Sequence, residues 1–363
     1  MKVLVIGGGP AGLTAAREAA LNGAEVTLIE EDKEIGKPDH CAGLVSIKGL
    51  KNILPNYEDV IINKIKRVKI FSPMGKCYEI LLNEYKAVVI DREKFDLKLM
   101  DMAEKVGVKI LTNTSFNSSF NYDILVNAEG VKARICRKFG LKIPKSIPAI
   151  QFDIELKNFD KDCVEIYTGK WTPEFFVWAV PRMDHVRLGL ASSGNPKELL
   201  ERFINKNIKF KGRILRTLWG KIVIGGPVDN TVKGNIVSIG DAAGFVKPTT
   251  GGGIVFGCLT AKIAGKMIAL NNLSMFDKKW KELYLNEFRK MLLTAKLFRI
   301  MNEKEIEKIL EKAYHLGLLK EISYYDMDFQ GSAINRIATS KIITTTFIPL
   351  LRLLKVYILE KIL

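Results

Sequence analysis

The first 31 residues contain the pattern that most constrains the fold. Residues 3–6 are apolar and predict a buried strand, residues 13–21 predict a helix, and residues 26–29 predict a second strand. The link between the first strand and the helix is rich in glycine, which permits a tight turn there. A strand, a glycine turn, a helix and a second strand in this order predict a parallel βαβ unit.

The glycines and one acidic residue form a dinucleotide-binding pattern. In G-x-G-x-x-G, Gly7 permits the turn, Gly9 lets the backbone approach a pyrophosphate, and Gly12 packs the helix against the strand. Glu30 ends the second predicted strand, where its carboxylate can accept hydrogen bonds from a ribose diol. The pattern therefore predicts FAD or NAD, rather than NADP, on a Rossmann-like α/β fold. A glycine turn without a ligand is the alternative, and the complete context argues against it.

Length and composition describe an ordered protein with room for roughly two or three domains. The chain has 363 residues, of which 47% are hydrophobic and 26% are charged. Its net charge of +16 favours an anionic partner such as lipid headgroups, nucleic acid or a phosphorylated substrate. Lysine-rich surfaces also serve solubility and heat tolerance, so the charge alone selects no partner.

Cysteine and histidine usage argues against disulfides and metal sites. The five cysteines and three histidines are scattered and show no C-x-x-C spacing, as expected of a protein in a reducing cytoplasm without structural zinc. The chain begins directly with a predicted strand, so we expect no signal peptide. No run of about eighteen apolar residues predicts a transmembrane helix. The nearest candidate, residues 347–363, carries four charged residues.

The periodicity of the chain changes after the first unit. Residues 64–82 predict a hairpin, and residues 93–106 predict a helix with Leu97 among its inward-facing residues. Strand-like runs between residues 148 and 191 predict an antiparallel sheet that forms a separate substrate layer. The pattern is helical from residue 276 onward.

Three further positions at the ends of predicted strands suit a nucleotide. Arg92 begins a helix, where its guanidinium can reach a phosphate or a ribose. Gly130 lies in a second glycine turn after the strand 122–126, and Asp241 ends a later strand. Residues 251–253 are glycines that open a helix, so they present bare N–H groups and a positive dipole end.

These motifs, in this order over residues 1 to about 270, resemble the geranylgeranyl reductase family, within the FAD enzymes folded like para-hydroxybenzoate hydroxylase. Two features narrow the resemblance to the reductases. Residues 173–181, PEFFVWAVP, are similar to P-x-x-Y-x-W-x-F-P, which lines the lipid cavity in that family. Residues 247–254, KPTTGGGI, are equally characteristic, and residues 41–43 resemble the cysteine loop beside the flavin.

The resemblance implies three sets of site residues. Those expected at the diphosphate, the adenosine and the ribityl chain of FAD are Gly7, Gly9, Ala11, Gly12, Glu30, Arg92, Ser115, Gly130 and Asp241. Those expected at the flavin ring are Cys41, Ala42, Gly43, Gly252, Gly253 and Ile254, with Cys41 also the candidate catalytic residue that positions or protonates the substrate. Those expected along the isoprenoid chain are Pro173, Phe175, Phe176, Trp178 and Pro181.

The sequence departs from the family pattern at three positions. Phe176 replaces a tyrosine and Val180 replaces a phenylalanine, which removes a hydroxyl and shrinks an aromatic in the predicted cavity. Glu129 replaces the usual aspartate before Gly130. Plain core packing is the alternative role for the aromatic residues, because buried strands also favour them.

The resemblance implies the fold, the activity and the partners. We expect an FAD-binding domain (1–50, 85–145 and 225–275), an inserted antiparallel substrate domain (51–84 and 146–224) and a C-terminal helical region (276–363). The implied activity is FAD-dependent hydrogenation of geranylgeranyl chains in ether-lipid precursors.

The expected partners are an isoprenoid lipid and an electron donor such as ferredoxin or NADPH. We expect a cytoplasmic protein, with the apolar and basic C-terminus as a candidate for peripheral membrane contact. One rival is a monooxygenase or halogenase on the same fold. The other is a basic flavoprotein that binds nucleic acid, for which no RNA-binding signature is present.

Overall fold

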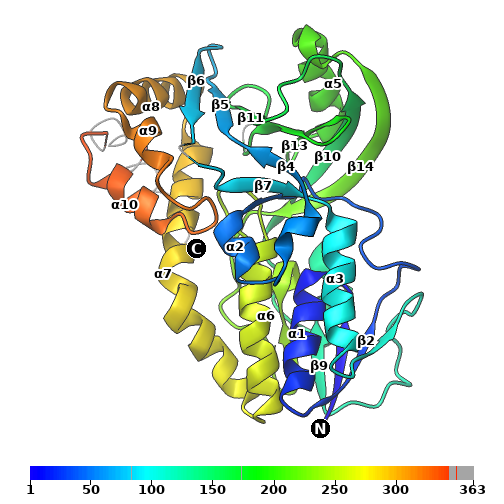
Figure 1. The fold of residues 1–363 in the computed structure, drawn as a ribbon. Coiled ribbons are helices and arrows are strands. Elements are labelled where there is room, and N and C mark those ends of the chain that lie inside the picture. Colours follow the sequence, from blue (N-terminus) through cyan, green and yellow to red (C-terminus); the bar gives the residue numbers. More distant parts are fainter. Residues whose placement is uncertain (83, 173, 343–348, 350–363) are drawn as a thin grey trace. The chain divides into compact units, whose positions relative to one another are not determined.

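The computed structural model describes the chain except for residues 83, 173, 343–348 and 350–363 (Figure 1). It divides into two compact units, each built from three separate parts of the chain. The first unit contains residues 1–61, 90–146 and 223–288, and the second contains residues 62–89, 147–222 and 289–363. Both units are therefore discontinuous in sequence.

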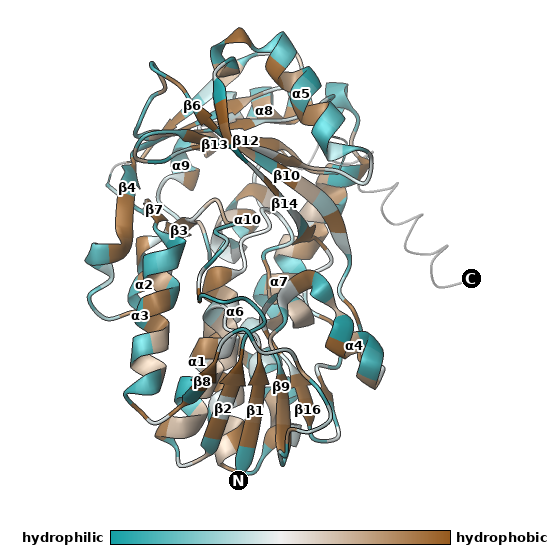
Figure 2. Cartoon of the chain, turned by 90° about the vertical axis from the view of Figure 1, so that its right-hand side faces the viewer, coloured by the Kyte–Doolittle hydropathy of each residue, from teal (hydrophilic) through white to brown (hydrophobic). Residues whose placement is uncertain are grey.

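The first unit is built on a six-stranded, mostly parallel sheet in the order β15-β16-β9-β1-β2-β8. The strands are β1 (Lys2–Ile6), β2 (Glu25–Ile29), β8 (Lys109–Leu111), β9 (Ile124–Asn127), β15 (Val232–Lys233) and β16 (Ile236–Ser238). Only the short edge pair β15 and β16 is antiparallel. The strongly apolar colour of β1, β2, β9 and β16 in Figure 2 agrees with burial on both faces. The predicted Rossmann-like sheet is confirmed.

Helices α1 (Pro10–Leu21), α3 (Arg92–Glu104) and α6 (Ile254–Ala269) pack beside one another in this unit. Helix α6 lies tightly against α1 at Gly265, where an added Cβ would lie 2.6 Å from the Cβ of Glu18. Leu97 was predicted to face inward, but 38% of it is exposed, so this prediction was wrong. Phe95, Leu99 and Ala103 already supply the buried stripe of α3. The unit also contains β3 (Leu44–Ser46), α2 (Ile47–Lys51) and α4 (Arg134–Phe139).

The second unit is built on a seven-stranded sheet in the order β14-β10-β13-β12-β11-β5-β6. The strands are β5 (Arg67–Phe71), β6 (Cys77–Leu81), β10 (Ser146–Glu155), β11 (Cys163–Tyr167), β12 (Val177–Pro181), β13 (Val186–Ala191) and β14 (Arg213–Val223). The predicted hairpin is the antiparallel pair of β5 and β6, and β10 to β13 form the predicted antiparallel sheet. One pair, β11 with β5, is parallel. A small neighbouring pair consists of β4 (Ile61–Ile65) and β7 (Ala87–Ile90).

Helix α5 (Pro196–Lys206) covers part of this sheet with an apolar face. Asn195 caps it by accepting a hydrogen bond from the N–H of Glu198 at 3.3 Å. The buried face places Phe203 against Tyr167, with ring centroids 4.8 Å apart. The later helices are α7 (Phe276–Ile300), α8 (Glu303–His315), α9 (Leu318–Ile322) and α10 (Gly331–Ala338), which confirms the helical pattern after residue 276 over the described residues.

A buried ion pair crosslinks two strands of the second unit. The guanidinium of Arg187 on β13 donates to both carboxylate oxygens of Asp153 on β10, at 2.7 and 3.0 Å. Both side chains are fully buried, and Arg216 adds a third contact to Asp153 at 2.7 Å. Burial opposes ionisation, but contacts with His185 and Arg187 hold the pKa of Asp153 well below its ordinary value. Asp153 therefore stays charged in the core.

Candidate functional site

The glycine turn after β1 is shaped by contacts within the chain at two positions and is open at a third. Gly7 has a φ of +108°, and an added Cβ would lie 2.3 Å from the carbonyl oxygen of Ala128. At Gly12 an added Cβ would lie 1.9 Å from the carbonyl oxygen of Gly7. Gly9, in contrast, has nothing within 4 Å of that position and caps α1 without a side chain. The first N–H groups of α1 are therefore available to a ligand.

Glu30 lies at the carboxyl end of β2 and is held by the backbone. Its carboxylate accepts hydrogen bonds from the N–H of Gly8 at 2.6 Å and from the N–H of Asp32 at 2.9 Å. These two bonds fix the side chain beside the glycine turn. A carboxylate fixed in this way has remaining acceptor capacity for a ribose diol.

A pocket of about 360 Å³ lies at the carboxyl ends of β1, β2 and β9. Five predicted residues share its lining: Gly7, Gly9, Glu30, Ser115 and Gly130. Sequence reasoning missed Phe116, Ile135 and Lys138 in the same lining. The signal for Phe116 was its position directly after Ser115, and Lys138 lies with its Nζ 4.7 Å from the centre of the Phe116 ring. A flat aromatic wall beside a fixed carboxylate suits an adenosine.

Glu129 and Glu31 organise the segment at the edge of this pocket. Glu129 accepts hydrogen bonds from the N–H groups of Arg134 and Ile135 at 2.9 and 2.7 Å, so it caps α4. A glutamate side chain is one methylene longer than the aspartate usual at this position, and here its carboxylate extends to these two N–H groups. Glu31 pairs with Lys132 and Arg134, and its hydrogen bonds to these two residues lower its pKa.

A second cluster surrounds the N-terminus of α6. An added Cβ at Gly253 would lie 2.6 Å from Oδ1 of Asp241, and one at Gly252 would lie 2.6 Å from Cε of Lys247. The helix begins at Ile254 without a side-chain cap. Ala11 of α1 approaches the same region, because an added Cβ at Gly240 would lie 2.8 Å from the Cβ of Ala11. Side chains larger than glycine would clash at Gly252 and Gly253. The uncapped N–H groups at the start of α6 can therefore be approached closely by a flat ligand.

Burial raises the pKa of Asp241 to about 6, and the positive charge of Arg92 opposes this rise. Around pH 6 such a carboxyl is partly protonated and can both donate and accept hydrogen bonds. This suits the hydroxyl groups of a ribityl chain, which also do both.

Arg92 connects this cluster to the cysteine loop. It donates to Asp96 at 2.8 and 3.1 Å, one turn along α3. Burial opposes its charge, but Asp96 and Cys41 raise the pKa of Arg92 well above its ordinary value. Cys41 is half-buried, and its sulfur also accepts from the N–H of Gly43 at 3.4 Å, with Ala42 between them. The structure thus brings Arg92, Cys41 and Asp241 together, and the predicted phosphate or ribityl contact of Arg92 stays a prediction.

The predicted substrate residues lie in the second unit. Phe175 and Phe176 stack with ring centroids 4.2 Å apart, and Trp178 meets both rings edge-on. Trp178 on β12 pairs with Gly189, whose missing side chain lets the indole lie across β13. The indole N–H then donates to Gln151 on β10 at 3.0 Å. Pro181 ends β12, and Pro173 lies outside the described residues.

The described residues contain no candidate metal site and no candidate membrane span. None of them form a group of three or more His, Cys, Asp or Glu side chains that is placed to hold a metal ion. No helix in the described part of the chain is long and apolar enough to cross a membrane. The apolar stretch 347–363, predicted as a membrane contact, lies outside the described residues except Pro349.

The geometry of the first unit fits FAD. The turn is open at Gly9, the pocket beside Glu30 has room for an adenosine, and the N-terminus of α6 is uncapped near Asp241. These features match the diphosphate, the adenosine and the flavin end of the molecule in turn. The structure therefore supports the predicted cofactor by shape and by donor set.

Comparisons with known proteins agree with this geometry. Residues 1–153 match the pyridine nucleotide-disulphide oxidoreductase family. An uncharacterized protein of Methanocaldococcus jannaschii is 34% identical over 91% of this chain and 92% of its own. A digeranylgeranylglycerophospholipid reductase of Methanocella arvoryzae is 30% identical over 74% of this chain and 77% of its own. One of Methanococcus aeolicus is 28% identical over 85% of this chain and 89% of its own.

Solved structures show the same fold. A geranylgeranyl bacteriochlorophyll reductase-like protein of Thermoplasma acidophilum has a TM-score of 0.82 at 23% identity, over 96% of this chain and 98% of its own. A flavin-dependent brominase has a TM-score of 0.67 at 15% identity, over 93% of this chain and 98% of its own. The matched family and the similarity to the curated reductases identify the chain as an FAD-dependent oxidoreductase, and these structures support its fold.

Proposed function

The chain belongs to the digeranylgeranylglycerophospholipid reductase family, and from this premise we propose that it hydrogenates the C=C double bonds of geranylgeranyl chains in membrane ether-lipid precursors. The observation that carries the proposal is the aromatic cluster in which the partly exposed Phe176 contacts the buried Phe175 and Trp178. An isoprenoid chain has no polar group that could form a hydrogen bond or an ion pair, so its binding depends on contact with apolar and aromatic side chains.

The first unit binds and orients the cofactor. The N–H groups beside Gly9 hold the diphosphate, Glu30 holds the adenosine ribose, and Asp241 holds the ribityl chain. Ser115 and Gly130 border the adenosine pocket. The residues expected at the flavin ring are those of the cysteine loop and of the start of α6: Cys41, Ala42, Gly43, Gly252, Gly253 and Ile254. Bound FAD supplies the hydride equivalent for the reduction.

Cys41 holds the proton that the reduction needs. An isolated double bond is a poor acceptor, so a proton source must lie near the second carbon. The sulfur of Cys41 is beside the guanidinium of Arg92, which Asp96 keeps in place. Apolar Phe175 and Phe176 help to exclude water from the chain being reduced.

We assign FAD binding and lipid binding to separate predicted domains. Residues 1–50, 85–145 and 225–275 serve FAD, and residues 51–84 and 146–224 serve the lipid chain. The C-terminal region predicted over residues 276–363 contains helices α7 to α10 in its described part. The chain has one dinucleotide fingerprint and no second one for a stable NADPH site, so electrons come from an external donor such as a ferredoxin or transiently bound NADPH. The lipid substrate brings the protein to the inner face of the membrane as a peripheral protein.

An anaerobic turnover experiment tests the proposal. The purified holoprotein is reduced with dithionite and mixed with digeranylgeranylglycerophospholipid, and the product mass is followed together with flavin reoxidation. We expect mass gains in steps of two hydrogens that keep pace with reoxidation. Flavin that reacts only with oxygen, giving a hydroxylated product, would instead establish the monooxygenase rival.

A further inference from the structure

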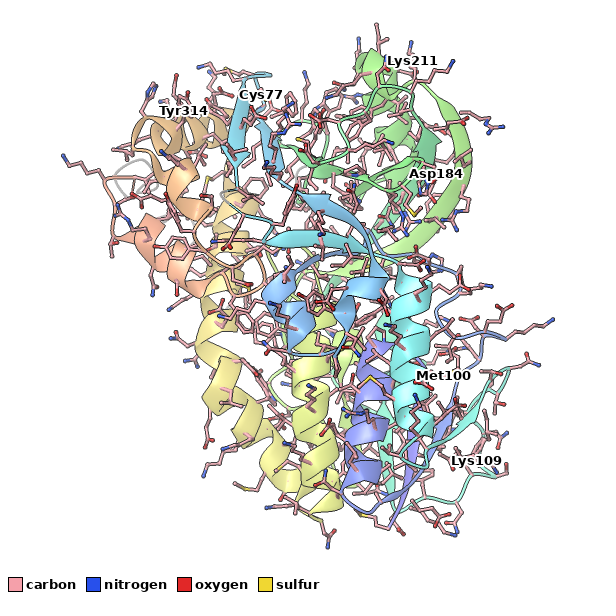
Figure 3. The ribbon with its side chains drawn as sticks, in the orientation of Figure 1. Cys77, Met100, Lys109, Asp184, Lys211 and Tyr314 are labelled. Carbon is pink, nitrogen blue, oxygen red and sulfur yellow. The ribbon has the colours of Figure 1, made fainter. Side chains whose placement is uncertain are left out.

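The segment from residue 206 to 221, called here the basic segment, combines exposed cations with exposed apolar side chains. It contains six Lys or Arg residues and no Asp or Glu. It begins at the end of α5 and includes most of β14, the edge strand of the seven-stranded sheet in the described part of the chain. Figure 3 labels Lys211, just before β14. No role in binding FAD or the isoprenoid chain accounts for this composition.

One face of β14 is exposed from Arg213 to Lys221. Because side chains alternate along a strand, Arg213, Leu215, Thr217, Trp219 and Lys221 lie on the same face, and all five are exposed. Trp219 is 52% exposed and Leu215 is 39% exposed. Ile208, just before the strand, is 75% exposed. A tryptophan and aliphatic residues kept in water along an edge strand are unfavourable unless another surface covers them.

The charge of the segment is only partly neutralised. Acidic residues of the neighbouring strands pair with half of its cations: Lys209 with Glu165, Arg213 with Glu155, and Arg216 with Asp153. Lys206, Lys211 and Lys221 are exposed and form no ion pair with any residue that the structure describes. The surface therefore keeps positive charge on both sides of its apolar residues.

We propose that the basic segment is the surface by which this protein docks on an anionic lipid bilayer, an inference that rests on the proposed lipid substrate. Tryptophan is favoured at the headgroup level of a membrane, and Lys and Arg are attracted by anionic headgroups. Ile208 and Leu215 add aliphatic side chains that can enter the acyl boundary. An acidic protein would match the charge alone, whereas the bilayer matches the charge and the interleaved apolar residues.

Vesicle flotation of the full-length holoprotein tests the docking surface. We expect the wild type to float with phosphatidylglycerol vesicles, to float poorly with phosphatidylcholine vesicles, and to be released by salt. Two double variants, Ile208→Ser with Trp219→Ser and Lys211→Glu with Lys221→Glu, should each weaken binding at least about tenfold. Two matched controls should bind like the wild type: Leu270→Ser with Leu283→Ser, which are 65% and 55% exposed, and Lys94→Glu with Lys109→Glu.

Turnover of detergent-dispersed lipid separates this inference from the proposed function. The segment variants should keep wild-type FAD content and wild-type turnover in detergent, while losing turnover of vesicle-borne lipid. If the wild-type protein does not bind anionic vesicles, or if the segment variants bind them as well as the wild type, the proposed docking surface is wrong. Neither result would contradict the proposed reductase activity. Vesicle binding without any lipid reduction would refute the reductase and keep the surface. Charge variants that lose only their response to a protein electron donor would assign the segment to that donor instead.

Discussion

The carboxylate of Glu30 accepts a hydrogen bond from the backbone N–H of Gly8 at 2.6 Å. This bond joins the end of β2 to the glycine turn that follows β1. A second bond, from the N–H of Asp32 at 2.9 Å, fixes the same carboxylate from the other side. The acceptor is therefore oriented before any ligand arrives, which lowers the entropic cost of binding a ribose.

Replacement of Glu30 by alanine should weaken FAD binding. The variant loses charged acceptors worth on the order of 1.5–3 kcal/mol, so the Kd should rise at least about tenfold. Flavin fluorescence titration of the apoprotein measures this. Glu25→Ala, at the exposed opposite end of β2, is the matched control. Full flavin occupancy in Glu30→Ala would count against the ribose contact.

The glycine turn predicts opposite outcomes for two alanine substitutions. Gly12→Ala should destabilise the first unit by several kcal/mol, because the new Cβ would lie 1.9 Å from a carbonyl oxygen. Gly9→Ala should leave the Tm nearly unchanged, since nothing lies within 4 Å, but should weaken FAD binding by blocking the diphosphate. Thermal unfolding of the apoproteins and flavin titration separate the two effects. Equal Tm values would contradict the packing role of Gly12.

Cys41→Ala should retain FAD and lose most lipid reduction, because the proton source beside Arg92 is removed. General acid catalysis typically contributes about 100-fold or more, so a decrease of that size in kcat is expected. The exposed Cys77 provides the control, and Cys77→Ala should behave as the wild type. Turnover that survives in Cys41→Ala would refute the catalytic role.

Asp241 should make the stability of the apoprotein depend on pH. Burial raises its pKa from 3.8 to about 6, so the folded state favours the neutral carboxyl. The stabilisation that the neutral carboxyl of Asp241 gives the folded state is complete below its ordinary pKa of 3.8. It disappears as the pH rises through about 6. Asp241→Asn should therefore gain stability over the wild type, on the order of 3 kcal/mol in total, as the pH rises from about 4 to about 7. Urea unfolding measures the difference, and a pH-independent difference would contradict the shifted pKa.

The buried pair of Asp153 and Arg187 should be costly to break. Asp153→Asn leaves Arg187 charged in the core without its partner, which typically costs about 3–5 kcal/mol. Glu155→Gln on the same strand removes an exposed pair with Arg213 and should cost less than about 1 kcal/mol. Because the folded pKa of Asp153 is lowered, its contribution is present above its ordinary pKa of 3.8 and falls in acid. Similar unfolding free energies for the two variants would contradict this ranking.

Local interactions made the first unit predictable. The turn after β1 needs glycine because of its positive φ and its close backbone contacts, and the flanking strands are short, continuous apolar runs. The spacing of the fingerprint also indicated that Gly7, Gly9 and Glu30 lie around one pocket, since strand and helix geometry fix where such residues lie. The four strands between residues 148 and 191 were predictable for the same local reason.

Contacts between distant parts of the chain decided the rest. Periodicity identifies a strand but not its partner, so the parallel pairing of Val164 on β11 with Val68 on β5 was not predictable. Likewise, no local sequence pattern predicts that Phe116 and Lys138 line the same pocket, or that Arg92 contacts Cys41. The sequence by itself determined the strands and the helix of the dinucleotide fingerprint, because these depend on neighbours within a few residues. The tertiary structure alone decided the strand pairing, the pocket walls and the charged partners, because these depend on which surfaces the folded chain buries together.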